Sequence, residues 1–201
     1  MQLCCAAQLE AVRPPQILEA TMGARKPRVT KEQAEQAIFD RFAKAYERHY
    51  GASLEGRVHR DKPDFSARDS VTTQTLGIEV TGAYHDAREA EINYWLNGDW
   101  GVLTGSLDNF VDSINQVFAD KSQTANAYDR VGPLLLAIWI GSFVFNQKRD
   151  MNFLAPRLTI PKNPYSLIAL VVTDDTGTLP TLHILQELTG GRESVNSRAD
   201  R

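Results

Sequence analysis

Apolar residues recur one helical turn apart over residues 31–49 and form a stripe of Ile38, Phe42 and Ala45, with Phe39 and Tyr46 beside it. This spacing predicts a helix. Thr30 and Gln33 stand at the spacing of a capping box, and Gly51 is a typical residue at a helix end. Glu35 lies on the same stripe, three residues before Ile38, so its carboxylate is expected on the side of the helix that faces the core.

A second stripe predicts a long helix that is capped by Thr104 or Ser106 and extends to about residue 129. Its members are separated by alternating steps of four and three residues: Leu107, Val111, Ile114, Phe118, Lys121, Ala125 and Tyr128. Lys121 is the only charged residue on this face. The pattern therefore predicts that its amine points toward the body of the protein.

Five apolar segments predict strands, at residues 63–68, 75–81, 134–140, 166–173 and 179–187. The first two flank a polar turn and form a hairpin. The third and fourth are continuously apolar, which is typical of central strands covered on both faces, and the fifth is expected at an edge. Residues 57–62 are expected to be a basic connector. Residues 82–105 are expected to hold a short helix at 87–95 and a glycine-containing loop. The segment between the third and fourth of these strands contains Pro156, Pro161 and Pro164 and is expected to be irregular. Helices and strands in this order predict an α/β protein.

Composition places this pattern in one globular domain. The chain has 201 residues, of which 42% are hydrophobic and 23% charged, with a net charge of −3. We expect the domain at 30–189, between an N-terminal arm (1–29, in which Met22 is an alternative start) and a flexible tail (190–201). The two cysteines, Cys4 and Cys5, are adjacent, which predicts neither a disulfide framework nor a zinc site and suits the cytoplasm. No apolar run is long enough to span a bilayer.

Two carboxylates are the strongest candidates for chemistry. Asp64 follows Pro63 at the start of the predicted hairpin. Glu79 lies inside its second strand, where Leu76, Ile78 and Val80 share one face and the glutamate shares the other with Gly77 and Thr81. A carboxylate inside an apolar strand is costly to bury unless it is paired or binds a metal.

Pro63-Asp64, then Glu79-Val80-Thr81, then the helix with Lys121 resemble the PD-(D/E)xK nuclease superfamily, in particular a subgroup in which threonine replaces the motif lysine. The resemblance covers roughly residues 30 to 175. It implies a restriction-endonuclease-like fold, with a central mixed sheet of four to five strands flanked by helices. It also implies metal-dependent hydrolysis of phosphodiester bonds, with DNA as the expected partner.

The resemblance further assigns roles to single residues. Asp64, Glu79 and the backbone carbonyl of Val80 would bind Mg²⁺ or Mn²⁺, which prefer oxygen ligands and activate water. The helix glutamate of the family corresponds to Glu35, with Glu32 as the substitute. The motif lysine is replaced by Thr81, which cannot act as a cation. Some family members carry this lysine on a neighbouring helix, and Lys121 is the natural candidate.

Other interpretations stay open at this level. Asp64 is also a common residue at a strand start, and Glu79 also fits the solvent side of a half-exposed strand. Phosphate contacts from the basic residues before Asp64 (Arg57, Arg60 and Lys62) compete with an ordinary solvated loop. The chain fits a catalytically inactive nuclease fold that binds nucleic acid or a protein, or an α/β interaction protein of another kind. A homodimer would match the two-fold symmetry of duplex DNA.

Overall fold

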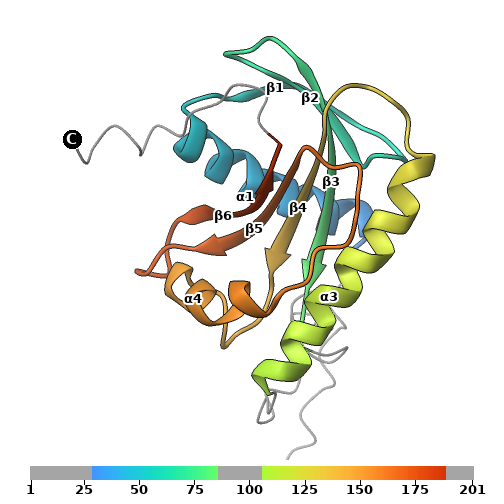
Figure 1. Ribbon diagram of the computed structural model, residues 1–201. Coiled ribbons are helices and arrows are strands. Elements are labelled where there is room, and N and C mark those ends of the chain that lie inside the picture. The colour runs from blue at the N-terminus through green and yellow to red at the C-terminus, as the bar shows by residue number, and fades with distance from the viewer. Residues whose placement is uncertain (1–28, 86–105, 189–201) are drawn as a thin grey trace, which may run out of the picture.

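The computed structural model describes residues 29–85 and 106–188, which build an α/β structure around one six-stranded open sheet (Figure 1). The strands are aligned in chain order: β1 (Leu54–His59), β2 (Phe65–Asp69), β3 (Thr75–Ala83), β4 (Leu134–Ile140), β5 (Leu167–Thr173) and β6 (Pro180–Glu187). The helices of the described residues are α1 (Lys31–Tyr50), α3 (Leu107–Thr124) and α4 (Met151–Leu154), with short 3-10 turns at Ala125–Ala127, Lys148–Asp150 and Ala155–Arg157.

The sheet is mixed. Strands β1, β2 and β3 form an antiparallel meander, β3, β4 and β5 run parallel to one another, and β6 returns antiparallel to β5. Helix α3 lies between β3 and β4 in the chain, and this crossover makes the parallel pairing geometrically feasible. Helix α1 covers one face of the sheet, while α3 and α4 lie on the other (Figure 1). The sheet therefore separates two cores.

The residues that predicted α1 form the first core. Thr30 Oγ1 accepts a hydrogen bond from the Gln33 backbone N–H at 3.2 Å, and Gln33 Oε1 accepts one from the Thr30 N–H at 2.9 Å. This reciprocal capping box begins the helix, and Gly51 ends it in the left-handed conformation, with φ of 66°. The predicted stripe of Ile38, Phe42 and Ala45 is buried against the sheet, and so are Phe39 and Tyr46 beside it.

Helix α3 begins after Ser106, whose side chain caps Asn109 N–H at 3.2 Å. Its predicted face is buried along most of its length through Val111, Ile114 and Phe118. The helix is shorter than predicted, because it changes into the 3-10 turn Ala125–Ala127 instead of continuing to residue 129.

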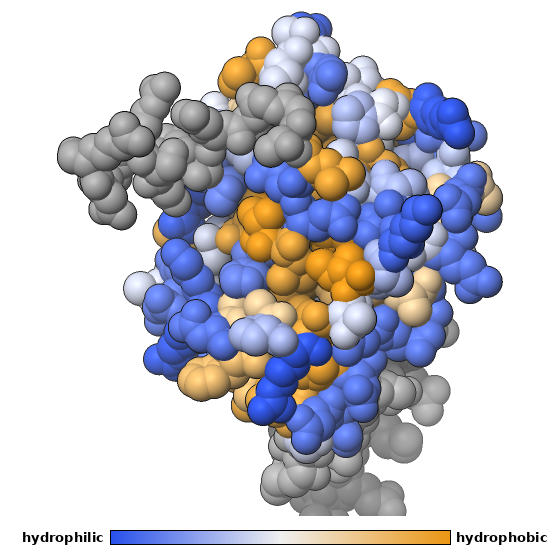
Figure 2. All heavy atoms as spheres, viewed as in Figure 1, coloured by the Kyte–Doolittle hydropathy of each residue, from blue (hydrophilic) through white to orange (hydrophobic). Residues whose placement is uncertain are grey.

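On the face shown in Figure 2, hydrophobic residues gather in the middle of the molecule and hydrophilic residues surround them.

The prediction of four to five strands was wrong, because the sheet has six. The missed strand is β1, which begins at Leu54 and takes in Arg57–His59 of the predicted connector. It is an edge strand whose residues after Leu54 are all exposed, so it carries no alternating apolar pattern. The short helix α4 was also missed, in the proline-containing segment expected to be irregular.

Strands β4 and β5 match the predicted apolar runs closely, and β6 lies at the edge, as predicted. The predicted helix at 87–95, most of the glycine-containing loop, the N-terminal arm with Cys4 and Cys5, and the tail lie outside the described residues. Within the described residues, no helix combines the length and apolar character needed to cross a membrane.

Candidate active site

The end of the β2–β3 ladder brings Asp64 and Glu79 together. The last pair of that ladder is Phe65 opposite Ile78, so the next step in the same register leads to Asp64 and Glu79. Instead of continuing the backbone ladder, Asp64 accepts a hydrogen bond through Oδ2 from the Val80 backbone N–H at 2.9 Å. The carboxylate thus satisfies a strand donor that would otherwise lack a partner, and it is held beside Glu79.

Gly77 contributes to this placement because it leaves room for the residue before Asp64. It lies on the same face of β3 as Glu79, two residues earlier, and a Cβ atom at Gly77 would lie 3.0 Å from Cγ of Pro63. That separation is shorter than an ordinary carbon–carbon contact of about 3.5–4.0 Å. A larger residue at position 77 would therefore displace the Pro63-Asp64 segment.

Both carboxylates are buried. Asp64 is 5% exposed and Glu79 is 3% exposed. Burial, together with the negative charge of Glu79, raises the pKa of Asp64 to about 7, although the Val80 N–H and Lys121 act in the opposite sense. Asp64 therefore exchanges a proton near neutral pH. A buried pair of acids that share one region of space in this way is a common feature of functional sites.

Lys121 extends from α3 to Glu79. Its Nζ lies 2.5 Å from Glu79 Oε1, and the lysine side chain is 26% exposed. The helical stripe predicted this inward direction. Thr81, which stands where the resemblance expects the motif lysine, is partly buried on β3. The structure thus places one ammonium group at the acidic pair, and it comes from the helix and not from the strand.

The remaining oxygen of Glu79 makes the site suitable for a cation. Glu79 Oε2 is buried, and none of the described groups bonds to it with good hydrogen-bond geometry, although the Tyr128 hydroxyl lies close to this carboxylate. A buried carboxylate oxygen without a partner is unfavourable by about 1–3 kcal/mol or more, and a bound ion would remove that penalty. Two carboxylates and one backbone carbonyl would supply oxygen ligands that Mg²⁺ accepts together with water. In the part of the chain that the structure describes, no group of three or more His, Cys, Asp or Glu residues gathers at a possible metal site.

Glu35 lies at the margin of this site and is 9% exposed. Lys31 Nζ lies 3.2 Å from its Oε1, and His59 Nε2 lies 3.1 Å from its Oε2. The charge of Glu35 also contributes to the raised pKa of Asp64. The buried position matches the prediction from the stripe, but both close partners of Glu35 come from outside the acidic pair.

Sequence reasoning did not assign Tyr128 and Tyr165 to the site. Burial raises the pKa of Tyr128, and the neighbouring charge of Glu79 adds to this effect. Tyr165 donates a hydrogen bond from its hydroxyl to the Lys121 carbonyl at 3.2 Å. Tyr128 was detectable, since it shares the helical stripe with Lys121. Tyr165 had no such signal, because it is 44 residues from Lys121 in the chain.

Two of the three basic residues predicted to contact phosphate form ion pairs within the protein. Arg57 pairs with Asp40 at 2.7 Å, and Arg60 pairs with Asp129 at 2.9 Å. Lys62 is exposed. The first two cations are therefore partly neutralised at the surface.

Searches for relatives add no assignment to this geometry. No protein-family model, no curated protein and no solved structure matches the chain.

Proposed function

We propose that this protein is a metal-dependent nuclease of the PD-(D/E)xK type that hydrolyses phosphodiester bonds, with DNA as substrate. The proposal is supported by the order of the elements. Helix α1, the meander β1–β3, the crossover helix α3 and the parallel strand β4 occur in the order that the restriction-endonuclease-like fold requires.

The observation that carries the proposal is the grouping of Asp64, Glu79 and Lys121. Two buried carboxylates meet at the end of one ladder, and a lysine from a different element contacts one of them at 2.5 Å. This arrangement lowers the stability of the fold, because each buried charge must be desolvated. Such destabilising groups of charges are typical of functional sites.

In this proposal Asp64, Glu79 and the Val80 carbonyl hold Mg²⁺ or Mn²⁺. When bound, the metal ion activates water and offsets the negative charge that develops on the phosphate. Asp64 must lose its proton to act as a ligand, so its raised pKa makes ion binding dependent on pH. Lys121, beside Glu79, orients the attacking water or stabilises phosphate oxygens with its ammonium group.

A cleavage assay tests this proposal directly. Purified protein is incubated with supercoiled plasmid, linear duplex, single-stranded DNA and RNA, with Mg²⁺, Mn²⁺ or EDTA. We expect metal-dependent cleavage of DNA that Asp64→Asn and Glu79→Gln each abolish without loss of the folded state. Asp112→Asn, which changes an exposed carboxyl on α3, is the matched control and should cleave normally. Cleavage that survives both site substitutions would refute the assignment.

A second candidate is a catalytically inactive nuclease fold that binds nucleic acid or a protein partner. The observation that favours it is Thr81 at the motif lysine position, with Lys121 already paired to Glu79. Retention of DNA on the protein, with no cleavage in either metal and no measurable Mn²⁺ binding, would select this candidate over the first.

A further inference from the structure

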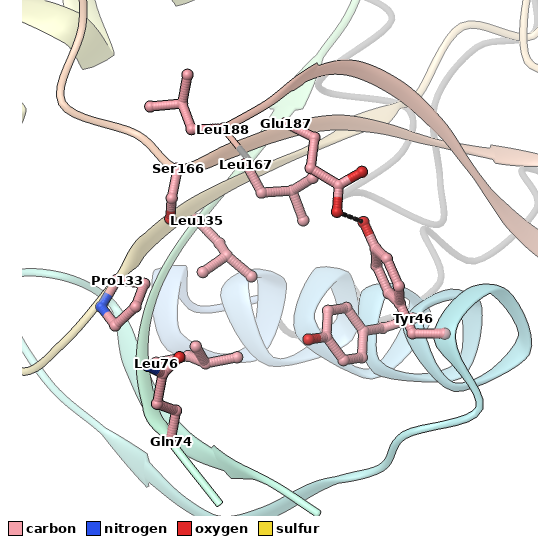
Figure 3. A pocket seen from close by; sticks show the side chains of 10 residues that line it. Tyr46, Gln74, Leu76, Pro133, Leu135, Ser166, Leu167, Glu187 and Leu188 are labelled. Atoms are coloured by element: carbon pink, nitrogen blue, oxygen red, sulfur yellow. Dashed lines mark hydrogen bonds between the residues drawn. The ribbon is translucent and has the colours of Figure 1, made fainter. Parts of the chain in front are cut away.

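A cavity lies on the opposite face of the sheet from the acidic pair. It has a volume of about 180 Å³ and lies where β3, β4 and β5 begin and β6 ends (Figure 3). Leu76, Leu135 and Leu167 line it from three neighbouring strands, and all three belong to the core under α1. Glu79 points to the other face of β3, so this cavity is separate from the candidate active site.

The lining combines an apolar interior with aromatic walls. Tyr46 and Tyr50 come from the last turns of α1, and their ring centroids lie 4.7 Å apart. An apolar cavity of about 150 Å³ is large enough for one benzene ring. The space here therefore admits one flat ring with a small substituent.

Three hydroxyl groups of the lining donate their protons within the protein. Tyr46 donates its hydroxyl proton to Asp69 at 2.9 Å, Tyr50 donates to Glu187 at 3.1 Å, and Ser166 donates to a backbone carbonyl at 3.0 Å. The other polar side chains of the lining are Gln74, which can donate and accept, and Glu187, whose carboxylate accepts only.

Glu187 determines the charge of that ligand. Its carboxylate lies at the mouth of the cavity, with one oxygen on the Tyr50 hydroxyl (Figure 3). Among the described residues, no lysine, arginine or histidine forms an ion pair with Glu187. The negative charge raises the pKa of Tyr50, in addition to the effect of burial. A cationic group at the mouth would meet this carboxylate, which attracts cations and accepts their hydrogen bonds.

We propose that this cavity binds a small organic cation with one flat aromatic ring, such as an aromatic amidine, with the ring among the leucines and the cationic group on Glu187. The ring matches the volume and the apolar interior, and the charge matches the carboxylate. The cation's N–H groups match the carboxylate oxygens of Glu187. The site is independent of any nuclease activity.

Benzamidine and benzamide form a matched pair of probes, because they have nearly the same shape and differ in charge. Binding is followed by two-dimensional NMR of the full chain labelled with ¹⁵N. We expect saturable benzamidine shifts at the backbone amides of residues 74–76, 135, 166–167 and 187–188. Benzamide should bind at least about tenfold more weakly, because it keeps one NH2 donor but lacks the positive charge and the second N–H group that pair with the carboxylate. Glu187→Gln should remove this difference.

Glu55→Gln is the matched control, since it neutralises an exposed glutamate on β1, away from the cavity. It should leave benzamidine binding unchanged, as should Glu79→Gln. Equal affinity for the two probes would overturn the proposal, as would benzamidine binding that persists at full strength in Glu187→Gln. Absence of saturable shifts at these amides in the wild-type protein would also overturn it.

Discussion

Asp64→Asn should stabilise the metal-free protein, and the gain should grow with pH. The pKa of Asp64 is raised from 3.8 to about 7 in the folded protein. Below pH 3.8 the carboxyl is protonated in both the folded and the unfolded state, so it has no net effect on the free energy of unfolding. Between about pH 4 and pH 7 only the unfolded state loses the proton, so the wild-type protein becomes less stable as pH rises. Above pH 7 the effect is constant.

The magnitude follows from the size of the shift. About three pKa units at 1.36 kcal/mol each correspond to about 4 kcal/mol, which is an order-of-magnitude value for a buried carboxyl. The asparagine cannot ionise, but its side-chain oxygen still accepts the Val80 N–H. The free energy of unfolding of Asp64→Asn minus that of the wild type should therefore rise by about 2–4 kcal/mol between pH 4 and pH 8.

Urea unfolding followed by tryptophan fluorescence, in EDTA at several pH values, measures this difference. Other carboxylates titrate in both proteins, so their contribution largely cancels in the subtraction. Asp112→Asn, with its exposed carboxyl, should give a difference that does not change with pH. A difference for Asp64→Asn that stays flat or falls between pH 4 and pH 8 would refute the reasoning that burial beside Glu79 destabilises the ionised form of Asp64.

Three further substitutions test other contacts. Lys121→Met should lower cleavage by at least about 100-fold, because a cation at the reacting phosphate is lost. Its Mn²⁺ affinity, measured by electron paramagnetic resonance, should stay equal or increase, because the charge of Glu79 is no longer offset by the lysine. Lys44→Met, which changes an exposed lysine on α1, should alter neither cleavage nor Mn²⁺ affinity. Gly132→Ala should lower the free energy of unfolding by about 2–4 kcal/mol, because φ is 148° and the new Cβ would lie 1.9 Å from a backbone oxygen. Asp69→Asn should cost about 1–3 kcal/mol, measured by urea unfolding, because this fully buried carboxylate accepts a tyrosine hydroxyl and two backbone N–H groups.

For each of these variants, one result would contradict the expected role of the residue. Full cleavage by Lys121→Met would show that the amine has no part in the reaction. An unchanged unfolding midpoint for Gly132→Ala would mean that the chain before β4 can shift without penalty. Wild-type stability of Asp69→Asn would mean that the turn after β2 does not depend on the charge of this carboxylate.

Local pattern was sufficient where one face of an element is buried along its whole length. Burial at a fixed repeat makes three features predictable from the sequence: the stripe of α1, the direction of Lys121 on α3, and the continuous apolar runs of β4 and β5. Strand β1 could not be predicted, because an exposed edge strand is held by backbone hydrogen bonds that any side chain permits.

The chain order alone accounts for the α/β class, the capped helices and the choice of Asp64, Glu79, Glu35 and Lys121 as candidates. The fold accounts for how they meet. Register at the end of the β2–β3 ladder brings Asp64 to Glu79 and sets its proton affinity, and the Tyr50–Glu187 contact joins residues 137 positions apart. Periodicity reports only which side of an element is buried. Distances, pKa values and cavities depend on what packs against that side, and this is established when the separate elements assemble.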